Sequence, residues 1–348
     1  MQILKKTKKG MISAASLFFL LFICRVAVSL TYVQSLMQGN LDANMLISVA
    51  VAFVFTMVLA IPALLCVQRG INPLDVKGFG IFYAANFIFL AALNVSRFSY
   101  FAAARLSPDV QSWPFALLIF LSAAYAASLG LEGLSRFSGF AFVLILLSIG
   151  VVLGSNLVAF KPVHLWPESI SPVQEILQNA LSLSSNTAAV VAFPLLAEHV
   201  EKKKRAAFSG AMVASYAVMF LLLLFSIGVM GDGATVQAFP VYSLSQLARI
   251  GEFGRLDVLY TGFWILAIFV KISMLLYCSA ISVQKFTHKM KCITFSALAF
   301  LLTLCMGMFA SVGSGSAPVT IVLFLLFSTV FPSLALLIKK GDKRLENH

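Results

Sequence analysis

Three basic residues, Arg25, Arg97 and Lys271, stand inside long apolar stretches of the sequence. A charged side chain in hydrocarbon is costly and usually faces a partner or a water-filled site, which makes it a candidate for ligand binding. No Asp or Glu stands in the middle of such a stretch. This pattern favours an anionic or zwitterionic ligand and argues against a cation-selective pore or a cation-coupled pump. The structural alternative is that Arg25 caps carbonyls of neighbouring helices and that Lys271 tethers adjacent helices.

A run of small polar residues in the middle of another apolar stretch is a second candidate. It consists of Ser182, Ser184, Ser185, Asn186 and Thr187. Such side chains hydrogen-bond to nearby backbone groups and weaken a regular helix. A break here would expose the N–H groups and partial positive charge of a half-helix N-terminus, which suit a substrate carboxylate. Ordinary packing is the alternative, because small residues are enriched where transmembrane helices meet.

A polar stripe precedes Arg97 in the same apolar stretch. Tyr83, Asn86, Asn94 and Arg97 are separated by three, eight and three residues. At about 3.6 residues per turn they share one broad helix face, which we expect to look inward. Arg97 lies nearer the end of the stretch, where its long side chain could reach the membrane surface.

The sequence contains no pattern typical of a metal site, a disulfide framework, a catalytic site or a nucleotide-binding loop. The five cysteines are scattered, and no two of the four histidines lie within three or four residues of each other. Neither a zinc site nor a disulfide framework fits these spacings. The sequence contains no G-x-S-x-G elbow and no Walker spacing. We therefore predict no catalytic residue, no metal, no cofactor and no enzymatic activity.

The composition indicates a chain surrounded by lipid. Of its 348 residues, 60% are hydrophobic and 11% are charged, and the mean hydropathy is +0.97. A soluble domain carries about 25% charged residues. The net charge of +12 could suggest nucleic acid. However, the basic residues form short runs between apolar stretches, as membrane topology requires, so we expect a lipid bilayer and no nucleic acid as partner.

Ten segments are long and apolar enough to span a bilayer, which takes about 20 residues. They are 13–36, 44–68, 78–104, 113–129, 136–154, 174–196, 206–230, 258–284, 291–311 and 317–338. With the N-terminus inside, the cytoplasmic segments hold 18 Lys and Arg residues and the outer loops hold 4. The positive-inside rule therefore places both termini in the cytoplasm.

The long connection 155–173 divides the spans into two sets of five. An odd number of spans in each half is typical of an inverted repeat, as in many secondary transporters. We expect one transmembrane domain over residues 1–348, with repeat one at about 13–154 and repeat two at about 174–338. A short amphipathic helix from Tyr242 to Ile250 is expected near the outer surface.

With these features in place, the chain resembles the spore germination permease family, the B subunits of nutrient germinant receptors. Three stretches carry the likeness. The first is Ser16-Leu-Phe-Phe-Leu-Leu-Phe-Ile-Cys-Arg-Val-Ala-Val-Ser29. The second is Leu181-Ser-Leu-Ser-Ser-Asn-Thr187 with Phe193-Pro-Leu-Leu196. The third is Phe239-Pro-Val-Tyr242, then Leu247-Ala-Arg-Ile250, then Trp264-Ile-Leu-Ala-Ile-Phe-Val-Lys-Ile-Ser273.

The resemblance implies a fold and a place for the ligand. The family belongs to the amino acid–polyamine–organocation superfamily, an all-α fold of five plus five inverted helices with helices one and six broken. The turn after Arg25 lacks the glycine that usually permits unwinding. A ligand would lie at the midplane between helices one, three, six and eight. The expected binding residues are Arg25, Val26, Ala27, Val28, Ser29, Asn94, Ser182, Ser184, Ser185, Asn186, Thr187 and Lys271.

The expected function is that of a sensor for a small nutrient, an amino acid, in the inner membrane of a bacterial spore. The resemblance alone implies two partners, an A-type membrane subunit and a C-type lipoprotein. An amino acid permease that transports its substrate is one alternative. A structural membrane subunit without a ligand is the other.

Overall fold

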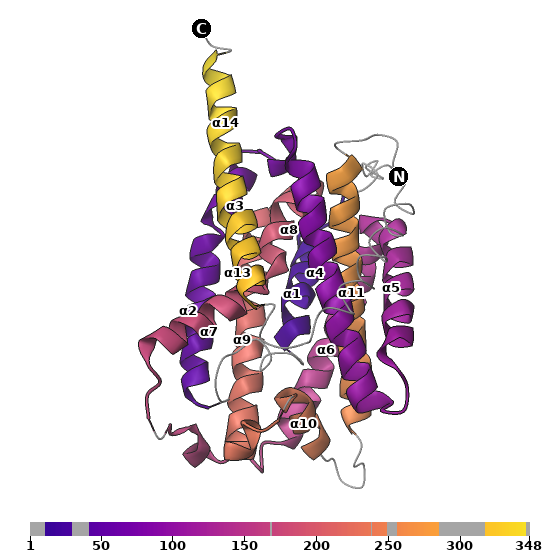
Figure 1. Ribbon diagram of the computed structural model, residues 1–348, viewed down its shortest axis with the longest axis vertical. Coiled ribbons are helices and arrows are strands. Elements are labelled where there is room, and N and C mark those ends of the chain that lie inside the picture. Colours follow the sequence, from indigo (N-terminus) through magenta and orange to yellow (C-terminus); the bar gives the residue numbers. More distant parts are fainter. Residues whose placement is uncertain are drawn as a thin grey trace, which may run out of the picture.

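The computed structural model describes residues 11–29, 42–167, 169–237, 239–248, 256–284 and 317–345. Its regular elements in these ranges are helices, and Figure 1 shows most of them running along the long axis of the molecule. Seven helical segments are long and apolar enough to cross a membrane, and Ala14–Ala27 and Ser112–Ser128 are shorter apolar helices. The prediction of an all-α membrane protein is confirmed.

The helices follow the predicted spans closely. Their bounds are α1 (Ala14–Ser29), α2 (Asn44–Leu59), α3 (Ile61–Gln68), α4 (Phe79–Phe101), α5 (Ser112–Ser128), α6 (Leu131–Ser155), α7 (Val173–Ser185), α8 (Ala188–Leu196), α9 (Lys204–Met230), α10 (Pro240–Leu247), α11 (Leu256–Gln284), α13 (Ala317–Leu325) and α14 (Phe331–Leu345). A π-helical turn over Leu326–Val330 joins α13 to α14. The predicted span 291–311 lies outside the described residues, so the count of ten remains a prediction.

Besides 317–338, which the π-helical turn divides, two predicted spans are each divided into two helices. The span 44–68 is interrupted at Ala60, because Pro62 at the start of α3 has no N–H to continue the hydrogen bonding of α2. The span 174–196 is interrupted between α7 and α8, where the chain has neither Gly nor Pro. The short helix expected over Tyr242–Ile250 is present as α10, although it begins at Pro240 and ends at Leu247.

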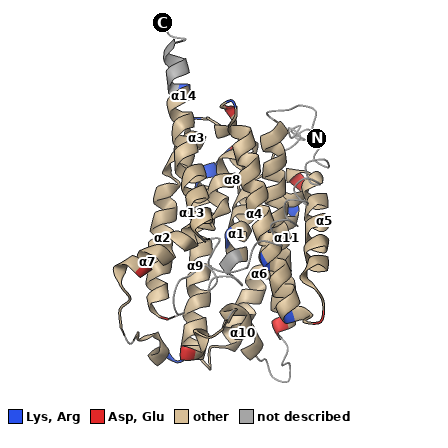
Figure 2. Cartoon of the chain, viewed as in Figure 1, with Lys and Arg blue, Asp and Glu red and all other residues tan. Residues whose placement is uncertain are grey.

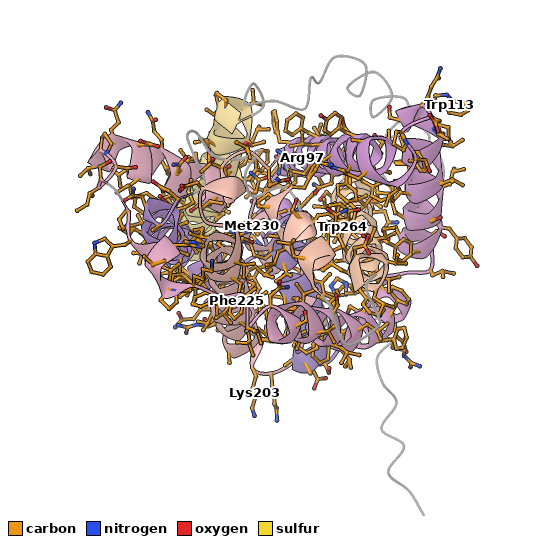
Figure 3. All side chains as sticks on the ribbon, turned by 90° about the horizontal axis from the view of Figure 1, so that it is seen from below. Arg97, Trp113, Lys203, Phe225, Met230 and Trp264 are labelled. Atoms are coloured by element: carbon orange, nitrogen blue, oxygen red, sulfur yellow. The ribbon has the colours of Figure 1, made fainter. Side chains whose placement is uncertain are left out.

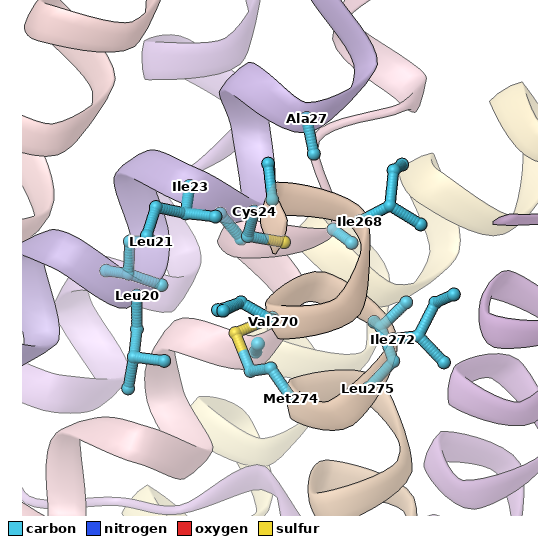
Figure 4. Packing of buried hydrophobic residues seen from close by; sticks show 14 of the residues in the cluster. Leu20, Leu21, Ile23, Cys24, Ala27, Ile268, Val270, Ile272, Met274 and Leu275 are labelled. Carbon is cyan, nitrogen blue, oxygen red and sulfur yellow. The ribbon is translucent and has the colours of Figure 1, made fainter. Parts of the chain in front are cut away.

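The interior of the bundle is built around α1 and α8. The helix α1 packs against α6, α8, α9 and α11. Figure 4 shows buried apolar side chains of α1, among them Leu20, Ile23 and Cys24, beside those of α11, among them Val270 and Met274. In the segment Val173–His199, 94% of the most apolar window is buried, compared with 33% in α6. The polar run at 182–187 therefore lies inside the protein.

The outer faces of several helices are apolar. Exposed large apolar side chains cover α2, α5 and α6; examples are Val54, Val58, Leu118, Phe140 and Val143. In water such a surface would be an interaction site or would promote aggregation. In a bilayer it is the surface that faces the hydrocarbon chains of the lipid. Figure 2 shows Asp and Glu at the periphery of the bundle. The chain is a multi-pass membrane protein.

Candidate functional site

The interruption of the sixth predicted span is the first element of the site. The helix α7 ends at Ser185 and α8 begins at Ala188, so Asn186 and Thr187 connect two helices. The backbone of Thr187 is non-helical, with φ −90° and ψ 65°. The break predicted from the polar run is therefore present, and it is buried, because Asn186 is 7% exposed and Thr187 is 0% exposed.

Side-chain hydrogen bonds to the backbone explain why the helix ends here. The hydroxyl of Ser184 donates to the carbonyl of Ala180 at 2.8 Å. The carbonyl of Ser182 accepts from Ser185 Oγ at 2.8 Å and from Asn186 Nδ2 at 3.2 Å. These bonds give the carbonyls of the last turn partners other than the next N–H groups of a continued helix. The hydroxyls of Ser184 and Ser185 are thus used by the fold, and the role of the serines as direct ligands remains a prediction.

Thr187 stands at the N-cap position of α8. Its Oγ1 makes no capping hydrogen bond and has no hydrogen-bond partner among the described residues. Unpaired buried hydroxyls are costly, and each calls for an explanation. The partial positive charge of the α8 N-terminus adds to this position. The break thus offers a hydrogen-bonding group and a favourable potential for an anion.

Arg97 connects α4 to the break. Its Nη1 donates to Asn186 Oδ1 at 2.8 Å, and the residue is 4% exposed. The expectation that this side chain could reach the membrane surface is therefore wrong, because it turns inward. Figure 3 shows Arg97 in the interior of the bundle and Trp113 and Lys203 at its edge. The helical spacing of Tyr83, Asn86, Asn94 and Arg97 predicted this inward placement.

The remaining members of the stripe are also buried, as the spacing predicted. Tyr83, Asn86 and Asn94 are each at most 5% exposed. Asn94 Nδ2 donates to the carbonyl of Leu90 in its own helix at 2.6 Å. This bond engages the Asn94 amide within α4, and the role of Asn94 in binding remains a prediction.

Arg25 lies in the middle of the bundle and contacts α9. It is 1% exposed, its guanidinium lies 4.4 Å from the centre of the Tyr216 ring, and Nη2 donates to Met219 Sδ at 3.4 Å. The ring is fixed by a hydrogen bond between its hydroxyl and Thr56 Oγ1. Nε and Nη1 of Arg25 have no hydrogen-bond partner among the described residues. This pairing with the seventh predicted span was not anticipated from the sequence.

The residues after Arg25 remain helical. The helix α1 continues without interruption through Ser29. Val26 and Ala27 are fully buried, and the carbonyl of Ala27 accepts a hydrogen bond from Trp264 Nε1 at 3.3 Å. The side chains of Val28 and Ser29 and the segment 30–41 lie outside the described residues. The break of the first span that was expected directly after Arg25 is therefore absent, because the backbone stays helical through Ser29.

Lys271 is the third buried cation. It is 1% exposed on α11. The structure therefore buries all three cations, which stand on α1, α4 and α11. Every buried charged side chain in the described part of the chain belongs to this set.

The arrangement can hold an anion. Buried like charges repel one another and lack the hydration that water would give them, so an anion that pairs with them recovers that energy. Within the described residues, no group of three His, Cys, Asp or Glu side chains could hold a metal ion. The site therefore combines Arg97, which bonds the interrupted helix, with the unpaired hydroxyl of Thr187 at the same interruption and the unpaired donors of Arg25 on α1.

Comparisons with known proteins agree with this architecture. The sequence model of a family described as spore germination protein matches residues 11–312. Comparison with curated proteins gives no match. The crystal structure of MhsT in complex with L-phenylalanine is similar at a TM-score of 0.64 and 13% identity, covering 94% of this chain and 88% of that one.

Two further solved structures share the fold. A variant of the Eremococcus coleocola manganese transporter has a TM-score of 0.52 at 13% identity, covering 97% of this chain and 79% of its own. A substrate-bound Na⁺-coupled sialic acid symporter has a TM-score of 0.50 at 12% identity, covering 96% and 79%. At such identities these likenesses show the fold alone, which is that of a membrane transporter.

Proposed function

The chain belongs to the spore germination protein family, and from this membership we propose that it is the nutrient-sensing membrane subunit of a germinant receptor. Family and fold support a nutrient-related membrane permease or receptor rather than an enzyme. The finer proposal is that the ligand is an amino acid and that its binding is read as a signal. The membrane would be the inner membrane of a bacterial spore.

The observation that carries this proposal is that Arg25 is buried and that part of its guanidinium group has no hydrogen-bond partner among the described residues. A guanidinium that is 1% exposed and leaves Nε and Nη1 without described partners is an expensive feature for a purely structural residue. A ligand carboxylate would supply the missing acceptor. Thr187 and the N-terminus of α8 would complete the carboxylate site.

Signalling requires that the ligand prefer one of two conformations. A ligand shifts an equilibrium only by its differential affinity for the two states. The α7–α8 connection is suited to respond, because it holds Asn186, the partner of Arg97. A change at this connection would reach α4 through that hydrogen bond, and the A-type membrane subunit and C-type lipoprotein would receive the signal.

Germination of spores that lack this gene tests the proposal. The expected result is loss of the response to one nutrient or a small set of nutrients, restored by the wild-type gene and not by an Arg25→Ala variant. Arg136→Ala is the control, because Arg136 pairs with Glu132 at the surface and should restore the response. An unchanged response to every nutrient would refute the sensing role.

A transporting permease is the second candidate, and the shared transporter fold favours it. Uptake of labelled ligand into proteoliposomes separates the two functions. Accumulation that depends on the protein supports transport, whereas binding without flux supports a sensor. Absence of any stabilising nutrient in a broad screen, together with a functional Arg25→Ala variant, would support a structural subunit.

The domain organisation and orientation are part of the same proposal. We infer one transmembrane domain made of two inverted repeats, at about 13–154 and 174–338, with both termini in the cytoplasm. The excess of Lys and Arg in alternate connections supports this orientation. Accessibility labelling of single cysteines placed in the connections would test it.

A further inference from the structure

A cavity of about 260 Å³ lies where α2 begins and α9 ends. Its polar and aromatic lining includes Asp42, His164, Trp166, Ser169 and Asp232. Figure 1 shows these two helix ends at the same end of the bundle, which the proposed orientation places on the outer side of the membrane. One water molecule occupies about 30 Å³ of liquid. The cavity therefore has room for a small organic molecule, and a single metal ion would leave most of it unfilled.

The connections around this cavity are acidic, although the whole chain has a net charge of +12. The connections before α2, between α6 and α7 and after α9 contain the acidic residues Asp42, Glu168 and Asp232 and the basic residue Lys161. Asp42 and Asp232 line the cavity, and neither forms an ion pair with a described residue. The described wall therefore presents two negative charges that no described cation neutralises.

Asn44 adds an unpaired acceptor to the same wall. It is 4% exposed, and its Nδ2 donates to Asp42 Oδ2 at 2.8 Å and to the carbonyl of Ser169 at 2.9 Å. Two acceptors thus fix the orientation of the amide, because a flipped amide would turn its oxygen towards them. Oδ1 of Asn44 is left without a hydrogen-bond partner among the described residues. A buried acceptor in this state calls for a donor, which a ligand with N–H groups would supply.

The position of His164 in the wall is fixed by α9. Its Nδ1 lies 3.0 Å from the carbonyl oxygen of Gly228. A carbonyl only accepts, so Nδ1 carries the proton and Nε2 of the neutral ring is an acceptor. Gly231 lets the ring lie close, because a Cβ at this position would stand 3.2 Å from ring atoms of His164. The neutral imidazole thus adds one more acceptor to the lining.

We propose that this cavity is a second ligand site, which binds a small organic cation that carries ammonium groups. An ammonium group has three donors and no acceptor, so it complements the carboxylates, the imidazole and the unpaired Asn44 Oδ1. The indole of Trp166, which is 87% exposed, lines the cavity and attracts a cation through its face. The inference goes beyond the proposed function, because this cavity contains none of the residues proposed to hold the nutrient carboxylate.

A matched pair of ligands tests the inference on the purified full-length chain in phosphatidylcholine nanodiscs, whose lipid carries no net charge. Calorimetry would compare 1,4-diaminobutane with 1,4-butanediol, because the two molecules have nearly equal shape and only the diamine is cationic. Sodium chloride at equal ionic strength controls for non-specific attraction. The diamine is expected to bind tenfold or more tightly than the diol, and its binding should change the fluorescence of Trp166.

A variant connects the binding to the cavity. Asp232→Asn removes one charge at nearly unchanged shape from an exposed residue, and it is expected to weaken diamine binding threefold or more. Asp109→Asn makes the same replacement on a different exposed connection and should leave the affinity unchanged. An unaltered melting temperature shows that each variant is folded.

Three results would overturn the inference. They are equal affinity for diamine and diol, binding of neither, and unchanged diamine affinity in folded Asp232→Asn. Calcium chloride in the same assay identifies a metal site: tighter binding of Ca²⁺ than of the diamine, with the same loss in Asp232→Asn, would replace the organic cation by a metal ion. The proposed nutrient sensing is tested separately, through Arg25→Ala, and stands or falls independently of these results.

Discussion

Replacing Arg25 with Met should make the unliganded protein more stable while abolishing ligand binding. The native guanidinium is 1% exposed, and its Nε and Nη1 lack described partners. An unsatisfied buried donor costs about 2 kcal/mol, so removing both recovers about 4 kcal/mol. The contact with the Tyr216 ring is worth about 2 kcal/mol when desolvated and is lost. The expected net stabilisation is about 2 kcal/mol.

Thermal and denaturant unfolding of the full chain in nanodiscs would measure both effects. Arg25→Met should unfold at a higher temperature than the wild type without ligand and show no further increase with ligand. Leu17→Met is the matched control, because Leu17 is fully buried on the same helix and a Leu-to-Met exchange conserves volume and costs less than about 1.5 kcal/mol. This control should retain the response to ligand.

The opposite sign of the stability change would refute the reasoning. If the guanidinium were a structural link between α1 and α9, its removal would destabilise the protein by about 3 kcal/mol or more, as expected for a broken buried charge interaction. Retained ligand binding in a stably folded Arg25→Met protein would separately remove the residue from the site.

Asn186→Ala should destabilise the protein by about 2 kcal/mol in the same unfolding assay, because it removes a hydrogen bond to a charged group at Arg97; no loss would show that this bond does not hold the break to α4. Gly80→Ala should cost about 1 to 3 kcal/mol, since a Cβ there would lie 2.5 Å from the carbonyl oxygen of Ser282 on α11. Gly150→Ala is its control, because a Cβ at this position meets nothing within 4 Å and alanine favours the helix, so equal destabilisation of both variants would contradict the packing explanation.

The sequence determined the features that depend on short-range physics. Span lengths follow from hydropathy, and the described helices coincide with the predicted segments apart from 291–311, which lies outside the description. The polar run from Ser182 to Thr187 predicted a break, because these side chains compete locally for the backbone of their own helix. The inward face of α4 followed from helical spacing alone.

Only the tertiary structure decided which side chains meet. Arg97 bonds Asn186 across 89 positions of sequence, and Arg25 reaches Met219 across 194. The periodicity of a helix tells which residues share a face but not which other helix that face meets, because the choice depends on packing between distant segments. The same limit explains why the sequence left open whether the Arg97 side chain turns inward or reaches the membrane surface. The apolar stretches taken one by one show three charges that are costly in hydrocarbon, and only the packing of the helices decides that all three are buried inside the protein.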